Sequence, residues 1–328
     1  MNRRAFTLIE VLTLILIMGM LAALLAVGSQ RTRRTAQLTE SLGNLKTITT
    51  LTASYQADNA DRFWSFSWPG GVVPSSTFAD LRNQAQTGND LAAASAQAVD
   101  IIRRRAPGGA AFPIITNWFP HILYSHLVLA DYSGRALPLK DFVSPAHASL
   151  VALSRDPFSG GLVRQGFQSS YEPGPTFYSP DRADGTNVGI SQGAQHNTYQ
   201  ITGNLTGIMG GRPLSAVAFP SQKAHIYDQA QRHFSVNPIY FAIQQARPLV
   251  LAVDGHAKVR HIAKCNPGFQ PTSPRALFST TYSYQPLASD PPIPGGGGSA
   301  SVQGFLRWTR GGLQGRDFDG REIDTSTW

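Results

Sequence analysis

The chain has 328 residues, of which only 15% are charged, while Gly (31) and Pro (22) are frequent. This profile favours a loop-rich domain that contains β-structure and argues against a helical bundle. A single cysteine, Cys265, excludes an intrachain disulfide, so the core alone must hold the fold. The Arg residues behind the net charge of +8 are mostly dispersed. We therefore expect a solvated basic surface or contact with acidic lipid headgroups, and no nucleic-acid binding.

The N-terminus combines an apolar run with one carboxylate. Residues 11–27 carry no charge, and Glu10 stands at the entrance of the run, after a short basic leader. As a helix, residues 6–27 extend about 33 Å, enough to cross the core of a bilayer. A carboxylate in such a segment is costly to bury, so it needs a partner, for which another copy of the chain is the natural candidate. The alternative is a cleaved secretory signal, although the run is long for one.

Residues 4–11, RAFTLIEV, resemble the cleavage and methylation motif of type IV pilins and type II secretion pseudopilins. The resemblance implies that a prepilin peptidase cuts between Ala5 and Phe6 and that the new amino group of Phe6 is methylated. It also implies that Glu10 neutralises the N-terminal amine of a neighbouring subunit, because a buried carboxylate opposite a buried ammonium is tolerable where either alone is not. The family usually has Gly where this chain has Ala5.

The function implied is that of a structural subunit of a type IV pilus or a type II secretion pseudopilus. Its partners would be the prepilin peptidase, other pilin or pseudopilin subunits and an inner-membrane assembly platform. The precursor would cross the inner membrane once with its N-terminus in the cytoplasm, and the globular domain would be periplasmic or, after assembly, extracellular. Two alternatives are a minor or tip-located adhesin that binds glycan or protein, and a membrane-anchored periplasmic binding protein that is not assembled. We expect no enzyme, because the sequence has no G-x-S-x-G, P-loop or dinucleotide motif.

The expected fold class is α+β: a long N-terminal helix, apolar in its first half and amphipathic in its second, packed on an antiparallel β-sheet domain with long loops. The amphipathic half covers residues 28–58, because apolar residues recur there at helical spacing: Leu38, Leu42, Leu45, Ile48, Leu51 and Tyr55. After a leader (1–5) and these two helix halves, we expect a globular domain over 59–290, a Pro/Gly linker or loop over 291–298, and a segment over 299–328 that packs back on the domain. The aromatic segment 62–71 is expected in the core, and residues 84–105 as one helix.

The clearest strand signals come late in the chain, in residues 216–219, 224–228, 248–253 and 256–259. Asp254-Gly255 joins the last two, which is a strong hairpin signal. This block resembles the C-terminal region of large pilin-like proteins of planctomycete-type bacteria, which end a strand with a similar Asp-Gly-His-Val pattern. Many of them have a His where this chain has Gln244.

Two acidic loops contain oxygen ligands of the kind that Ca²⁺ prefers: Asp181, Asp184 and Asn187 in one, Asp317 and Asp319 in the other. Since major pseudopilins use a calcium loop, calcium is a tentative cofactor, although Asp/Asn/Gly turns are ordinary without a metal. No other cofactor is expected. The pairs His121/His126 and His256/His261 do not have the spacing of two ligands on one helix face, so we expect scattered structural histidines.

Overall fold

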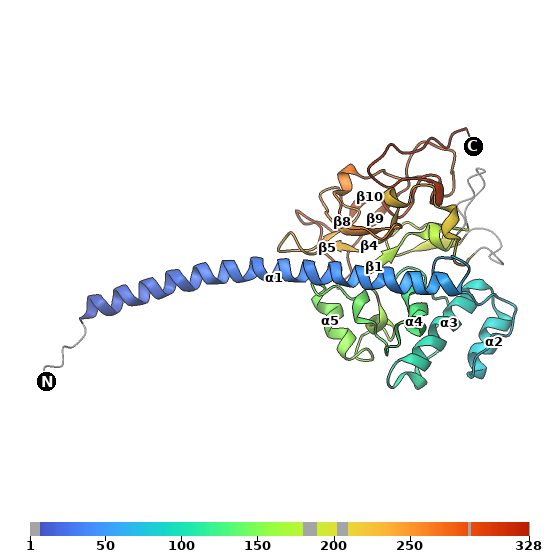
Figure 1. Cartoon of the computed structure of the whole chain (residues 1–328), viewed down its shortest axis with the longest axis horizontal. Helices are drawn as coiled ribbons and strands as arrows, with labels where there is room; N and C mark the ends of the chain where they lie inside the picture. Colours follow the sequence, from blue (N-terminus) through green and yellow to red (C-terminus); the bar gives the residue numbers. More distant parts are fainter. Residues whose placement is uncertain (1–6, 180–188, 202–208, 288–289, 328) are drawn as a thin grey trace.

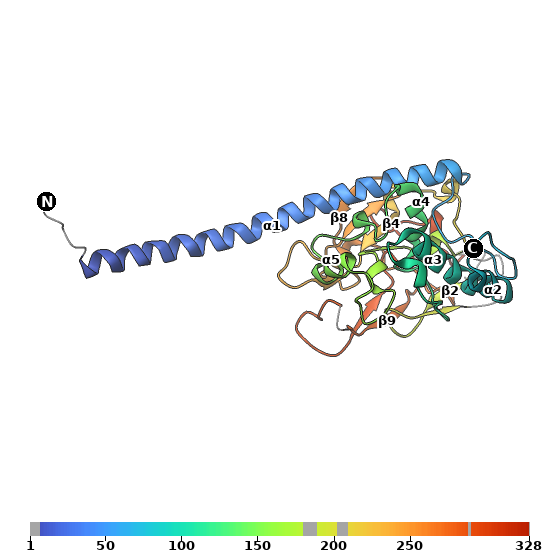
Figure 2. The same cartoon turned by 90° about the horizontal axis from the view of Figure 1, so that it is seen from below.

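In the computed structural model, the structure describes residues 7–179, 189–201, 209–287 and 290–327, with the backbone alone for 25–27. A single helix of 51 residues, α1 (Leu8–Asp58), leads into the globular body. Its first half projects away from the body, and its second half runs along one edge of it (Figures 1 and 2). Both predicted halves of the helix are thus confirmed as one continuous element, and the fold is α+β.

The body contains short helices and short antiparallel strands. The α-helices are α2 (Ala79–Thr87), α3 (Asp90–Arg105), α4 (Ala130–Ser133) and α5 (Ala148–Arg155). The strands are β1 (Tyr171–Pro173), β2 (Ile190–Gln192), β3 (Tyr199–Ile201), β4 (Ala224–Asp228), β5 (Ala230–Gln231), β6 (Ile239–Tyr240), β7 (Leu249–Ala252), β8 (Ala257–Val259), β9 (Thr281–Tyr284) and β10 (Ala300–Gln303). Single turns of 3-10 helix lie between them at Gly109–Ala111, Ser125–Leu129, Lys140–Phe142, Gln165–Phe167, Pro175–Phe177, Leu214–Ala216, Pro220–Gln222, Ile262–Lys264 and Gly312–Gln314.

The central sheet has the strand order β1-β4-β7-β8, and every neighbouring pair is antiparallel. Because successive residues of a strand point to opposite faces, β7 contributes to two cores. Leu249 and Leu251 pack with α1 and α3, whereas Val250 and Ala252 pack with the β9–β10 hairpin and the C-terminal segment. The sheet therefore separates a helical layer from a layer made of the end of the chain.

The predicted Asp-Gly hairpin is confirmed. Strands β7 and β8 pair with Leu249 opposite Val259 and Leu251 opposite Ala257. Gly255 takes a φ of +89° in the turn, a backbone conformation that favours glycine. A Cβ on Gly255 would lie 3.0 Å from the Cγ2 atom of Thr49, so the turn also needs glycine to approach α1 closely.

The buried stripe of α1 differs in part from the predicted one. Leu45, Ile48 and Tyr55 are buried, but Leu42 is 37% exposed. In its place Ser41 is buried, with its hydroxyl 3.4 Å from that of Ser144, and Thr52 is buried as well. The side chain of Thr52 accepts a hydrogen bond from Nε1 of Trp64 at 3.0 Å. Small polar residues with local partners therefore belong to the packed face.

Two local predictions are wrong. The helix predicted over 84–105 is two helices, because Gly88 is extended and the side chain of Asn89 caps α3 by accepting from the N–H of Ala92. The strand predicted over 216–219 is absent from the described residues, since Leu214–Ala216 and Pro220–Gln222 form 3-10 turns around that stretch. A proline at the end of a short apolar run removes a donor that a strand ladder would need.

The remaining segments follow the predictions more closely. In the aromatic segment, Phe63, Trp64 and Phe66 are buried in a packed loop. Residues 291–298 lie in the loop of the β9–β10 hairpin and are mostly exposed. The end of the chain returns to the body, with Trp308 and Phe318 each 2% exposed.

Candidate assembly segment and buried polar centres

The first half of α1 is a continuous exposed apolar surface. Its large hydrophobic side chains between Leu8 and Leu24 range from 45% to 88% exposed. Since burial of one such side chain is worth about 1.5–3 kcal/mol, this surface is strongly unfavourable in water. The helix is long and apolar enough to cross a membrane and lies at the N-terminus, as an anchor or a secretion signal does.

Glu10 lies in the first turn of this helix, where it forms a capping box with Thr7. One carboxylate oxygen of Glu10 accepts hydrogen bonds from the backbone N–H and the hydroxyl of Thr7, both at 2.8 Å. In return the Thr7 hydroxyl accepts from the backbone N–H of Glu10 at 3.4 Å. Such reciprocal bonds satisfy the free donors of a helix N-terminus and fix where the helix begins. The predicted processing residues Ala5 and Phe6 lie outside the described residues.

The second half of α1 is held to the body by polar contacts as well as by its apolar stripe. The side-chain amide of Gln37 donates to the carbonyl of Pro145 at 3.1 Å, and that of Asn59, at the C-cap, donates to the hydroxyl of Tyr132 at 2.8 Å. These contacts join both ends of the packed half to segments far away in the sequence. The exposed first half is thus continuous with a helix segment that is held to the domain.

Of the residues proposed for calcium, Asp181, Asp184 and Asn187 lie outside the described residues. Asp317 is buried and accepts hydrogen bonds from the N–H of Ala224 at 2.8 Å and from the hydroxyl of Thr309 at 2.5 Å, while Nζ of Lys223 lies 3.4 Å away. Asp319 forms an ion pair with Arg260. Among the described side chains, no group of three His, Cys, Asp or Glu is placed to hold a metal ion. Asp317 and Asp319 thus have protein partners, and calcium in the other loop stays a prediction.

His121, His126 and His256 lie in different surroundings. His121 and His126 are buried, and burial lowers the pKa of each to about 3. His256 follows the Asp-Gly turn, where its Nδ1 lies 2.6 Å from Asp254 and its Nε2 accepts from Arg260 at 3.2 Å. Because Arg260 also pairs with Asp319, this chain of contacts ties the hairpin turn to the C-terminal segment.

One buried polar centre was not predicted from the sequence. Glu172 on β1 and Arg307, just after β10, are each about 1% exposed and form two hydrogen bonds of 2.8 and 2.9 Å. The hydroxyls of Tyr199 and Tyr227 also donate to Glu172, at 3.2 and 3.1 Å. The pair therefore connects the first strand of the sheet to the end of the chain. The two residues are 135 positions apart, so no local pattern in the sequence could have indicated it.

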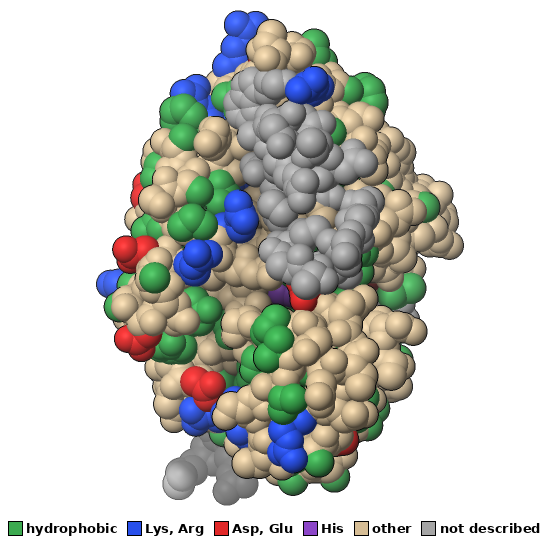
Figure 3. Space-filling view, turned by 90° about the vertical axis from the view of Figure 1, so that its right-hand side faces the viewer, with side chains coloured by type: hydrophobic (Ala, Val, Ile, Leu, Met, Phe, Trp, Pro, Cys, Tyr) green, Lys and Arg blue, Asp and Glu red, His purple; other side chains and the backbone are tan. Residues whose placement is uncertain are grey.

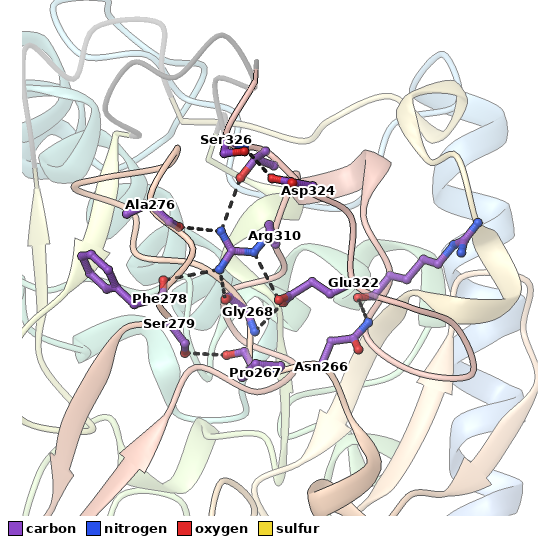
Figure 4. Close-up of polar contacts among 12 residues, drawn as sticks. Asn266, Pro267, Gly268, Ala276, Phe278, Ser279, Arg310, Glu322, Asp324 and Ser326 are labelled. Atoms are coloured by element: carbon purple, nitrogen blue, oxygen red, sulfur yellow. Dashed lines mark hydrogen bonds and ion pairs between the residues drawn. The ribbon is translucent and has the colours of Figure 1, made fainter.

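A second buried arginine, Arg310, organises the last turns of the chain (Figure 4). Its guanidinium donates to the carbonyls of Ala276 and Gly268, at 2.6 and 3.0 Å, and its Nε lies 3.2 Å from Glu322. Glu322 in turn accepts from the N–H of Gly268 at 2.8 Å. Since most of its donors are used by backbone carbonyls of loops, Arg310 acts as a structural clamp.

The end of the body opposite the projecting helix has a mixed surface. Basic, acidic and hydrophobic side chains are interspersed on the part of this face that is not grey in Figure 3. The exposed half of α1, whose surface is mainly apolar, therefore differs in composition from this face of the domain.

No family model matches the chain, and no curated protein or solved structure is significantly similar to it.

Proposed function

We propose that the protein is a filament subunit of the type IV pilus or type II secretion pseudopilus class, assembled through the first half of α1. The observation that carries the proposal is the continuous apolar surface from Leu8 to Leu24 with one carboxylate, Glu10, at its entrance. The capping box gives Glu10 a local role in any helix, and an assembled helix bundle can in addition pair its carboxylate with the amine of a neighbour. The RAFTLIEV motif around it supports the same class.

In this proposal the precursor waits in the inner membrane with its leader in the cytoplasm. A prepilin peptidase removes residues 1–5, and the apolar half of α1 leaves the lipid to pack against other subunits. The Glu10 carboxylate then pairs with the Phe6 amine of a neighbour and sets the axial register. Because the packed half of α1 is continuous with this segment, the register of the helices also places the globular domain on the filament surface.

The test is the yield of assembled filament from Glu10 variants, with a matched control. Glu10→Gln keeps a side chain that can complete the capping box but removes the charge. We expect it to lower incorporation at least tenfold, because the neighbouring amine would be buried without a counter-charge. Glu40→Gln, at an exposed position of the same helix, should assemble normally. Normal filament yield from Glu10→Gln would refute the proposed assembly mechanism.

A further inference from the structure

One lysine lies in the interior of the body, against a carboxylate from the C-terminal segment. Lys223, which directly precedes β4, is 0% exposed, whereas the other lysines are exposed: Lys46, Lys140, Lys258 and Lys264. Its Nζ atom lies 3.4 Å from Oδ2 of Asp317, which is buried as well. Lysine is almost never fully buried without a partner, because its ammonium is strongly hydrated in water. At this depth only protein groups can compensate for the lost hydration.

A hydroxyl group connects the amine of Lys223 to the carboxylate of Asp317. The Nζ atom donates to the hydroxyl of Thr309, which in turn donates to Oδ1 of Asp317 at 2.5 Å. The other carboxylate oxygen, Oδ2, accepts from the backbone N–H of Ala224 at 2.8 Å. On another side of the amine, Nζ lies 5.5 Å from the centroid of the Phe177 ring. The two groups are thus held in contact, with a donor on each carboxylate oxygen.

We propose that Nζ of Lys223 and Cγ of Asp317 become joined by an amide bond, with release of one water molecule. The bond links the start of β4 to the C-terminal segment. A single cysteine excludes an intrachain disulfide, so this amide gives the body a covalent cross-link of another kind. A cross-link between residues far apart in the sequence restricts the unfolded chain and thereby stabilises the fold.

The reaction begins with a proton transfer that neutralises both groups. The Thr309 hydroxyl takes a proton from Nζ and passes its own to Oδ1, which leaves a neutral amine and a neutral carboxyl group. A site of low dielectric favours this state, because burial disfavours charged forms. The lone pair of Nζ then attacks Cγ and forms the C–N bond, while one pair of the C=O double bond moves to Oδ2. There the N–H of Ala224 stabilises the negative charge.

The second half of the reaction expels water. The Thr309 hydroxyl relays a second proton from nitrogen to Oδ1, the C–Oδ1 bond breaks, and the C=O double bond forms again at Oδ2. The products are one amide and one water molecule, so the step needs no oxidant, reductant or co-reactant. Contact between the reacting groups replaces a bimolecular encounter. Because the side chains of Lys223 and Asp317 are 0% and 1% exposed, bulk water has little access to reverse the reaction.

The test is mass spectrometry of the full-length protein, denatured so that only covalent bonds join the two segments. We expect an intact mass lower by one water molecule, and a branched tryptic peptide that joins the residues around Lys223 to those around Asp317. The branched peptide does not include the N-terminus, so this result is independent of leader cleavage and of filament assembly.

Two lysine variants locate the bond. Lys223→Arg keeps a positive charge for Asp317, but a guanidinium stays protonated and cannot attack, so this variant should have the full mass of its sequence. Lys258→Arg is the same substitution at an exposed position of β8 and should keep the branched peptide. Thr309→Val keeps the branched side chain but removes the relay, so the fraction of cross-linked chains at a fixed time after expression should fall at least about tenfold.

A wild-type protein with the full mass of its sequence and no branched peptide would overturn the proposal and leave an ordinary buried ion pair. A loss of one water that persists in Lys223→Arg would place the dehydration at another residue and would overturn it as well. An undiminished cross-linked fraction in Thr309→Val would refute the relay. The wild-type mass decides the proposal even where a variant fails to fold.

Discussion

Replacement of Arg307 by Met removes the guanidinium that neutralises Glu172 in the interior of the domain. Glu172 is fully buried and would keep the hydroxyls of Tyr199 and Tyr227 as donors, but it would have no counter-charge in contact. Loss of one partner from a buried ion pair typically costs about 3–5 kcal/mol, because a charge is left without compensation. The two tyrosine hydroxyls soften this loss, so we expect a cost near 3 kcal/mol.

The assay is urea unfolding of the full-length protein in detergent, followed by tryptophan fluorescence. With a slope of about 1–3 kcal/mol per molar urea, Arg307→Met should lower the midpoint by roughly 1–3 M. Arg321→Met, at an exposed position of the same C-terminal segment, should stay within about 0.5 kcal/mol of the wild type.

A double variant separates the ion pair from the packing of the side chains. Glu172→Gln with Arg307→Met removes both charges, so its cost should be smaller than the sum of the two single costs by at least about 2 kcal/mol. A cost below about 1 kcal/mol for Arg307→Met, or two single costs that simply add, would show that the ion pair does not stabilise the fold.

Three further predictions concern the core and the turn. Burial lowers the pKa of three histidines to about 3, so the unfolded chain takes up protons below pH 6.5 that the folded chain does not: His121, His126 and His225. His147 and His233 act in the same direction, because burial lowers their pKa as well. Stability should therefore fall by on the order of 5 kcal/mol between pH 7 and 5.5, once the smaller opposite effect of Asp228, whose pKa burial raises to about 6, is subtracted. His225→Phe should flatten this slope in urea titrations, and an unchanged slope would show that His225 does not contribute to it. Gly255→Ala should destabilise the fold by about 1–3 kcal/mol, because alanine would be strained both by the positive φ and by the contact with Thr49. Gly43→Ala, on the exposed side of α1, should instead stabilise the fold by about 0.5–1 kcal/mol. Equal midpoints of the two variants in thermal unfolding would contradict this. Cys265 is buried with its pKa raised to about 12, so a thiol reagent should label it after unfolding and hardly before, and rapid labelling of the native protein would contradict its placement.

The long helix and the hairpin could be predicted because their signals are local. An uncharged run followed by apolar residues at helical spacing indicates α1, and Asp254-Gly255 between two apolar segments indicates the turn. The exceptions on α1 have a tertiary cause. Ser41 and Thr52 replace Leu42 on the packed face because partners from other segments, Ser144 and Trp64, satisfy their hydroxyls.

The tertiary polar centres could not be predicted in this way. The partners of Glu172 and of Arg310 are set by strand order and by the return of the chain end, which leave no spacing signal in the sequence. The same holds for Asp317, which looks like a metal ligand in an Asp/Gly-rich loop but is buried against Lys223 and Thr309. Composition shows that such residues are present, and only the fold shows which of them meet.

The proposed filament function depends most directly on what happens at Ala5 and Phe6. The deciding measurement is the intact mass and N-terminal sequence of the full-length protein after co-expression with a prepilin peptidase. We expect a mature chain that begins with N-methylated Phe6. An unprocessed chain that begins at Met1, or a cut near Ala26, would contradict it and leave an anchored or secreted protein that is not assembled.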